Sequence, residues 1–133
     1  MTLVVDASIA VKWVLPEADS AAAAALRRQD AELIAPSLVA AEIGSAIWKA
    51  ARRGNIEHAE ALAGIEAALL SFETLFPIEE LRVQALALAL DLGHPIYDCF
   101  YLALAQRRNA PLVTADEAMI AAARRAKIEV RRV

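Results

Sequence analysis

Four acidic residues lie in apolar surroundings, where a chain of alternating strands and helices has no structural use for them. Asp6 follows the run Leu-Val-Val, Asp116 follows the apolar segment 111–115, and Glu42 and Asp98 lie inside otherwise apolar predicted helices. Buried carboxylates are costly unless paired, and two of them ~4 Å apart repel by roughly 4 kcal/mol at an effective dielectric near 20. A divalent cation removes that repulsion, and oxygen ligands favour Mg²⁺ or Mn²⁺ over Zn²⁺. The pattern predicts a metal site suited to hydrolysis or transfer at phosphorus.

Local alternatives exist for some of these acids. No lysine or arginine stands three or four positions from Glu42 or Asp98, so a shared cation is the simplest partner for both. Asp6 and Asp116 could instead cap the helices that follow them. Glu66 also has apolar neighbours at helical spacing without any other sign of a site, so an apolar helix face alone does not identify a ligand.

Composition narrows the class of protein. With 133 residues and 59% hydrophobic composition, the chain is expected to form one domain over 1–133. Its apolar stretches are too short to span a membrane, and Asp6 and Lys12 interrupt the first of them, so we expect neither a membrane segment nor a secretory signal, and a cytoplasmic location. Cys99 is the only cysteine and is expected to pack as a small apolar side chain. The net charge of -3 confines any nucleic-acid contact to a local surface.

Short apolar runs alternate with helical patterns along the chain. We expect strands over 3–5, 33–35, 74–76, 112–114 and 128–130. Expected helices cover 8–15, opened by Ser8; 17–28; 37–53, capped by Ser37; 55–72, capped by Asn55; 79–92; 95–108; and 116–127. This alternation predicts an α/β fold with a parallel sheet covered on both faces. Asp6 and Asp116 each follow a strand, so both are expected at the carboxyl edge of the sheet, where such folds bind ligands.

Four ordered segments carry a family resemblance. They are VVDASIAVKW, PSLVAAEIGSAIWKA, HPIYDCFYLALA and LVTAD, in that order and at these separations. Together they resemble the PIN-domain ribonucleases, specifically the VapC-type toxins of type II toxin–antitoxin systems, and the resemblance extends over essentially the whole chain. It implies a three-layer α/β/α fold with a short central parallel sheet. Cys99 departs from the pattern, which has a small residue such as alanine at that place.

The resemblance also implies a function and a site. The expected activity is that of a Mg²⁺-dependent endoribonuclease, with Mn²⁺ as an alternative ion, an RNA substrate, a cognate antitoxin protein and a homodimeric state. Ser8 and Thr114 would orient the carboxylates or metal-bound water. The acids that match the catalytic and metal-binding positions are Asp6, Glu42, Asp98 and Asp116.

Other side chains could take part in binding. Basic residues at positions 12, 49, 52 and 53 could contact RNA phosphates, or could simply lie on solvated helix faces. Trp13 and Trp48 are expected in the core rather than at a binding surface.

Two other functions fit parts of the pattern. A receiver-like signalling domain also clusters acids around Mg²⁺, but it needs paired acids after the first strand and leaves Glu42 unused. A non-catalytic binding module of the same fold would not need all four acids. A hydrolase triad of Ser8, His94 and Asp98 is disfavoured, because no nucleophile-elbow sequence surrounds Ser8.

Overall fold

The computed structural model describes residues 1–17 and 20–133. Its centre is a five-stranded parallel sheet in the order β3-β2-β1-β4-β5. The three middle strands are almost wholly buried, as expected of continuously apolar strands that are covered on both faces. The strands are β1 Thr2–Val5, β2 Glu32–Pro36, β3 Thr74–Phe76, β4 Leu112–Thr114 and β5 Val130–Arg132.

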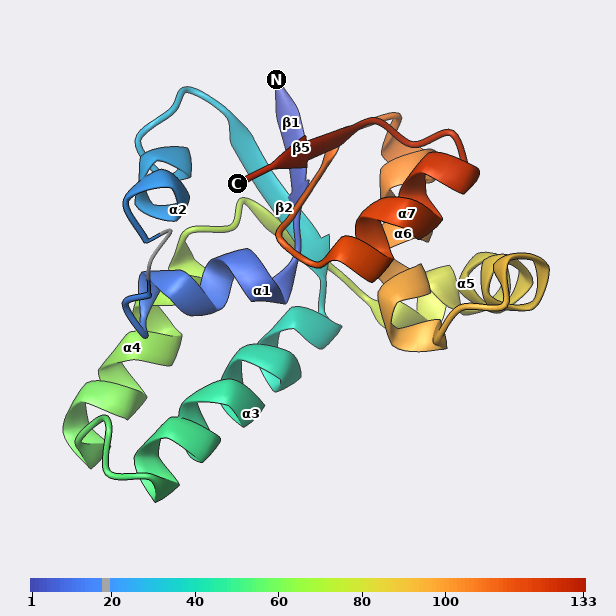
Figure 1. The fold of residues 1–133 in the computed structure, drawn as a ribbon. Coiled ribbons are helices and arrows are strands. Elements are labelled where there is room, and N and C mark those ends of the chain that lie inside the picture. The colour runs from blue at the N-terminus through green and yellow to red at the C-terminus, as the bar shows by residue number, and fades with distance from the viewer. Residues whose placement is uncertain (18–19) are drawn as a thin grey trace.

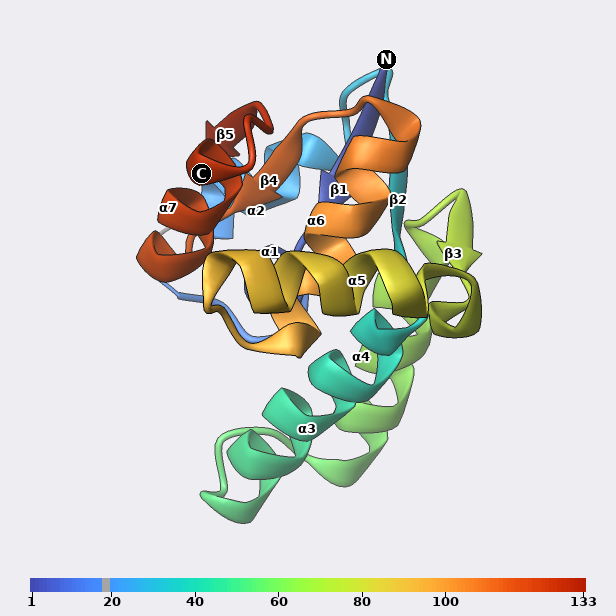
Figure 2. The ribbon, with the colours of Figure 1, turned by 90° about the vertical axis from the view of Figure 1, so that its right-hand side faces the viewer.

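Helices cover both faces of this sheet, which confirms the predicted three-layer α/β/α architecture (Figures 1 and 2). The helix α6 packs across β1, β2 and β4, and α5 lies on α6. The short helices α1, η1 and α2 lie on the opposite face, while α3 and α4 form an antiparallel hairpin that extends away from the sheet. The bounds are α1 Ala7–Ala10, η1 Val11–Trp13 (a 3-10 helix), α2 Ser20–Leu26, α3 Leu38–Arg52, α4 His58–Leu70, α5 Ile78–Leu92, α6 Ile96–Arg108 and α7 Glu117–Arg125.

The strand order reverses on the two sides of β1. The chain moves from β1 to β2 and β3 on one side, then returns to place β4 on the other side. Ligand sites in such sheets lie at the carboxyl ends of the strands where this reversal occurs, here between β1 and β4. The order also differs from the flavodoxin-like order of receiver domains, in which the third strand lies beside the first, so the receiver-like alternative is wrong for this chain.

Several predicted boundaries were wrong because a turn closes the preceding helix. The N–H of Asn55 donates to Ala50 O at 2.9 Å and completes the end of α3, so α4 begins at His58 rather than at Asn55. The N–H of Ile128 likewise donates to Ala123 O at 2.9 Å, and the last strand starts at Val130. The helix expected over 17–28 is observed at 20–26, and its positions 18 and 19 lie outside the described residues.

Two predicted serine caps are also absent. Ser37 precedes α3 but makes no side-chain cap; its Oγ accepts the N–H of Ile78 at 3.3 Å and so ties α3 to α5. The first helix begins at Ala7, with Asp6 rather than Ser8 at its N-cap position. Ser8 lies inside the first turn, where its hydroxyl serves the site described below.

The two tryptophans occupy different environments. Trp13 packs against the core and donates from Nε1 to Ala23 O at 2.8 Å, as expected. Trp48 is 57% exposed, so the prediction that it is buried was wrong. It lies in the second half of α3 and lines a groove between α3 and α4, with the Arg52 guanidinium 5.1 Å from its ring centroid.

Two further expectations concern single side chains. Cys99 is fully buried, as predicted, and burial raises the pKa of its thiol to about 11, so it stays protonated at neutral pH. Lys12 was expected on a solvated face or at RNA, but it lies in η1 and is buried. Within 1–17 and 20–133, no helix combines the length and the apolar character needed to cross a membrane.

Candidate metal centre

Asp6 lies at the end of β1, at the reversal of strand order. Its N–H donates to Val113 O at 3.0 Å, so sheet pairing places it beside the last residue of β4. Its side chain is buried, with 5% of the residue exposed. A single carboxylate oxygen, Oδ2, accepts hydrogen bonds from Ser8 Oγ at 2.7 Å and Thr114 Oγ1 at 2.8 Å. Both hydroxyls predicted to orient carboxylates therefore contact Asp6.

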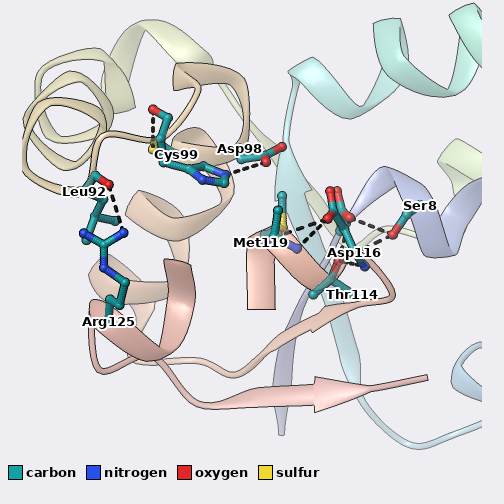
Figure 3. A network of polar contacts seen from close by, with 11 residues as sticks. Ser8, Leu92, Asp98, Cys99, Thr114, Asp116, Met119 and Arg125 are labelled. Carbon is teal, nitrogen blue, oxygen red and sulfur yellow. Dashed lines mark hydrogen bonds and ion pairs between the residues drawn. The ribbon is translucent and has the colours of Figure 1, made fainter. Parts of the chain in front are cut away.

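Backbone groups fix the direction of these two hydroxyls. The N–H of Ala115 donates to Ser8 Oγ at 3.3 Å, and the N–H of Asp116 donates to Thr114 Oγ1 at 3.1 Å. Each oxygen thus accepts a backbone hydrogen and directs its own hydrogen to Asp6. Figure 3 shows Ser8, Thr114 and Asp116 gathered at the end of β4, with Asp98 projecting from the neighbouring helix.

Glu42 reaches the same region from α3. Its Oε1 accepts a hydrogen bond from the Tyr101 hydroxyl at 2.7 Å. Tyr101 is fully buried on α6, and burial, followed by the charges of Glu42 and Asp6, raises the pKa of its phenol. The phenol is therefore protonated and donates. Tyr101 was not predicted as a site residue, and no local pattern could have revealed a partner 59 positions away.

Asp98 comes from the first turn of α6. His94 Nε2 lies 2.7 Å from Asp98 Oδ2, with side-chain exposures of 12% and 24%. From sequence, His94 was paired with Asp98 only in the disfavoured hydrolase triad, although its place four positions earlier is the spacing at which helical side chains make contact. Ser8 bonds Asp6 rather than His94, which gives no support to the hydrolase triad.

The three carboxylates influence one another electrostatically. Burial, partly offset by the two hydroxyl hydrogen bonds, raises the pKa of Asp6, and the charge of Asp98 raises it further. Burial also raises the pKa of Glu42, where Tyr101 opposes the shift and the charges of Asp6 and Asp98 add to it. Among the described residues, no lysine or arginine is an ion-pair partner of any of the three. Three segments thus bring carboxylates to one region, and none of the three carboxylates forms an ion pair with a lysine or arginine of the described residues.

Asp116 differs from the other acids. It is exposed at the N-terminus of α7, where its Oδ1 accepts the N–H of Ala118 at 2.9 Å and that of Met119 at 3.4 Å. This is the helix cap that the sequence left as an alternative. Capping uses Oδ1 of Asp116. Binding of a metal ion by its other carboxylate oxygen stays a prediction. Glu66 is exposed on α4, consistent with its place outside the predicted site.

The donor set fits a hard divalent cation in its chemistry, since every candidate ligand is a carboxylate. As the side chains stand, no three His, Cys, Asp or Glu groups of the described chain are close enough together to enclose an ion. Ligation of one ion by Asp6, Glu42 and Asp98 would therefore require their carboxylates to move closer together. Glu42 and Asp98 are partly exposed, which leaves them more room to move than the buried Asp6 has.

Comparison with known proteins decides the family. The sequence profile of the PIN domain matches residues 3–125. The chain belongs to the PIN-domain family. This confirms the resemblance stated from its four sequence segments, and the fold agrees with it.

Relatives of this PIN domain include proteins named as VapC. The chain is 37% identical over 118 residues to "Ribonuclease VapC3" of Pyrobaculum aerophilum, covering 87% of this chain and 90% of that protein. The fold also matches the crystal structure of PAE2754 from Pyrobaculum aerophilum, with a TM-score of 0.70 and 27% sequence identity. The match covers 98% of this chain and 83% of that one. VapBC2 from Rickettsia felis, bound to a DNA fragment from its promoter, has a TM-score of 0.73 and covers 99% and 98% of the two chains. At 16% identity, this last likeness shows the fold alone.

Removing the Tyr101 hydroxyl should destabilise the fold. Tyr101→Phe leaves the ring packing in place but deletes the donor to Glu42, a hydrogen bond to a charged group worth about 1.5–3 kcal/mol. We expect the free energy of unfolding, measured by urea titration, to fall by about that amount. Tyr97→Phe, at a residue 63% exposed on the same helix, should change it by less than about 0.5 kcal/mol. Equal effects of the two substitutions would contradict the assigned contact.

The metal-free protein should lose stability as pH rises, relative to Asp6→Asn. Burial holds the pKa of Asp6 above its ordinary value of 3.8. The native state therefore keeps a proton that the unfolded chain releases, and stability present below the unfolded pKa is lost as pH rises through the folded pKa. The asparagine variant has no such ionisation.

Urea titrations in chelator at about pH 4 and about pH 7 would measure this difference. The free energy of unfolding of Asp6→Asn, relative to that of the parent, should be higher at the upper pH than at the lower pH. Asp91→Asn, at an exposed residue of α5, should gain little. The explanation fails if both variants follow the parent across the range.

Proposed function

We propose that this chain is a Mg²⁺-dependent endoribonuclease of the VapC type. The observation that carries the proposal is that three separate segments bring Asp6, Glu42 and Asp98 to the reversal of strand order, near enough for the charge of Asp98 to raise the pKa of both Asp6 and Glu42. None of the three forms an ion pair with a lysine or arginine among the described residues. A relative named as a ribonuclease, 37% identical over most of the chain, supports the same reading.

The residues divide into ligands and residues that orient them. Asp6, Glu42 and Asp98 would hold the ion directly, with Mn²⁺ as an alternative to Mg²⁺, and Asp116 would contribute through the oxygen that does not cap α7. Ser8 and Thr114 hold one oxygen of Asp6 and leave the other for the ion. A bound divalent cation supplies charge neutralisation at a phosphodiester and lowers the pKa of a water molecule that attacks it.

Two partners belong to this proposal. The substrate is RNA, which the name of the 37% identical relative supports, and the activity is held off by an antitoxin protein, as the resemblance to VapC-type toxins implies. A cytoplasmic location and a single domain over 1–133 stay predictions.

A non-catalytic binding module with the same fold is the alternative, and loss of activity in site variants distinguishes the two.

Each ligand should be indispensable for cleavage. Asp6→Ala, Glu42→Ala and Asp98→Ala should each reduce RNA hydrolysis by more than about 100-fold, beyond the effect of losing an outer partner of a metal site. Each should relieve growth inhibition on expression. The metal-free fold should remain intact, because removing one carboxylate reduces repulsion and desolvation and so offsets the hydrogen bonds that Asp6 and Glu42 accept in the parent.

Glu66→Ala is the matched control, since it removes an exposed acid from a helix outside the site. It should retain cleavage and toxicity. Purified protein with fluorescent RNA substrates would measure the rates. If the parent cleaves no RNA in Mg²⁺ or Mn²⁺, or the three variants keep its rate, the chain is a binding module instead.

We also propose a homodimer. Val83, Leu86 and Leu90 lie on one face of α5 and are 73%, 49% and 75% exposed. Such a row of apolar side chains is suited to a self-complementary interface with a second copy. Light scattering should give the mass of a dimer for the parent and of a monomer for Leu90→Lys. A monomeric parent at micromolar concentration would contradict the dimer and leave the catalytic proposal intact.

A further inference from the structure

A histidine beside the candidate metal centre holds one oxygen of Asp98. His94 Nε2 and Asp98 Oδ2 are 2.7 Å apart, and the His94 side chain is only 12% exposed. The carboxylate can only accept, so the ring nitrogen is the donor. The neutral Nε2–H tautomer and the imidazolium both supply that hydrogen, so the contact does not depend on the charge of the ring.

The position of Asp98 in its helix explains why it needs this donor. Asp98 is the third residue of α6 after Pro95, which occupies the N-cap position. In the capping box, a glutamate or glutamine at this third position turns back to accept a hydrogen bond from the N–H of the N-cap residue. Proline has no N–H, so that bond is impossible here. The ring of His94 supplies a donor from one residue earlier.

The backbone holds His94 in place. Gly93 ends α5 with φ 61, a left-handed conformation that glycine adopts without strain, and the N–H of His94 donates to Ala89 O at 3.2 Å. Pro95 follows with φ -54, and a proline also restricts the backbone of the residue before it, which here is His94. The ring therefore projects from a backbone of restricted conformation at the corner between α5 and α6.

We propose that His94 is a positioning residue, which fixes Asp98 through Oδ2 and leaves Oδ1 to ligate the cation. This inference rests on the metal site of the proposed function. Without the histidine, the partly exposed Asp98 side chain would sample other rotamers, and ordering it again would oppose metal binding. Outer partners of this kind alter metal affinity by about 10- to 100-fold.

The affinity of the purified protein for Mn²⁺, measured from the electron paramagnetic resonance signal of free Mn²⁺, tests the proposal. His94→Ala should weaken binding by about 10- to 100-fold. His94→Gln should restore most of the affinity, because the glutamine amide also presents a donor at the end of its side chain. His58→Ala replaces the other histidine, which is exposed on α4, and should bind as the parent does.

Asp6→Asn separates failure of this inference from failure of the metal site. If Asp6→Asn binds Mn²⁺ as the parent does, the metal site itself is wrong. If Asp6→Asn loses binding while His94→Ala keeps the parent's affinity, His94 does not position a ligand. The same conclusion follows if His94→Gln binds as weakly as His94→Ala. Should His94→Ala fail to fold in chelator, as judged by circular dichroism, parental affinity in His94→Gln still supports the proposal and its loss overturns it.

Discussion

The burial of the Asp6 carboxylate at the end of β1 is the constraint on which the site depends. A buried charge requires compensation, and no lysine or arginine ion pair supplies it among the described residues. Two hydroxyls provide hydrogen bonds but no charge, so burial still raises the pKa of Asp6. Approach of Asp98 and Glu42 adds to the cost. A divalent cation is the partner that would make this arrangement favourable, and the PIN-domain fold agrees with such a use.

The surrounding structure serves this constraint. Parallel pairing of β1 with β4 brings Thr114 to Asp6, and the first turn of α1 brings Ser8 to the same oxygen. The helix α6 carries both Tyr101 and Asp98. Tyr101 donates a hydrogen bond to Glu42, and Asp98 accepts one from His94. Each of the three carboxylates thus has one oxygen fixed by a protein donor. Fixing one oxygen of each carboxylate would limit the rotations that binding of a cation has to order.

Much of this could be predicted from sequence, because strands and helices leave periodic apolar patterns. The strands at 74–76 and 112–114 and the end of the helix at Leu92 were correct, since Gly, Pro and apolar runs mark them locally. The predicted start of α4 was wrong, because it depends on how the preceding α3 ends. The predicted burial of Trp48 was also wrong, because it depends on how far α3 extends beyond the core. The Tyr101–Glu42 contact could not be predicted, since it depends on tertiary packing. His94 and Asp98 were paired from sequence only in a disfavoured hydrolase triad, although their spacing of four residues is a local signal of contact.

Thermal unfolding in chelator and in millimolar Mg²⁺, for the parent and Asp6→Asn, tests the central claim most directly. An ion that binds only the native state raises its stability, by about 2.7 kcal/mol at a concentration 100 times the Kd. The parent should therefore melt at a higher temperature in Mg²⁺ than in chelator, and Asp6→Asn should lose most of that increase. A parent whose melting temperature does not move, or an Asp6→Asn variant that shows the parent's full increase, would contradict the account of a cation that compensates the buried carboxylate.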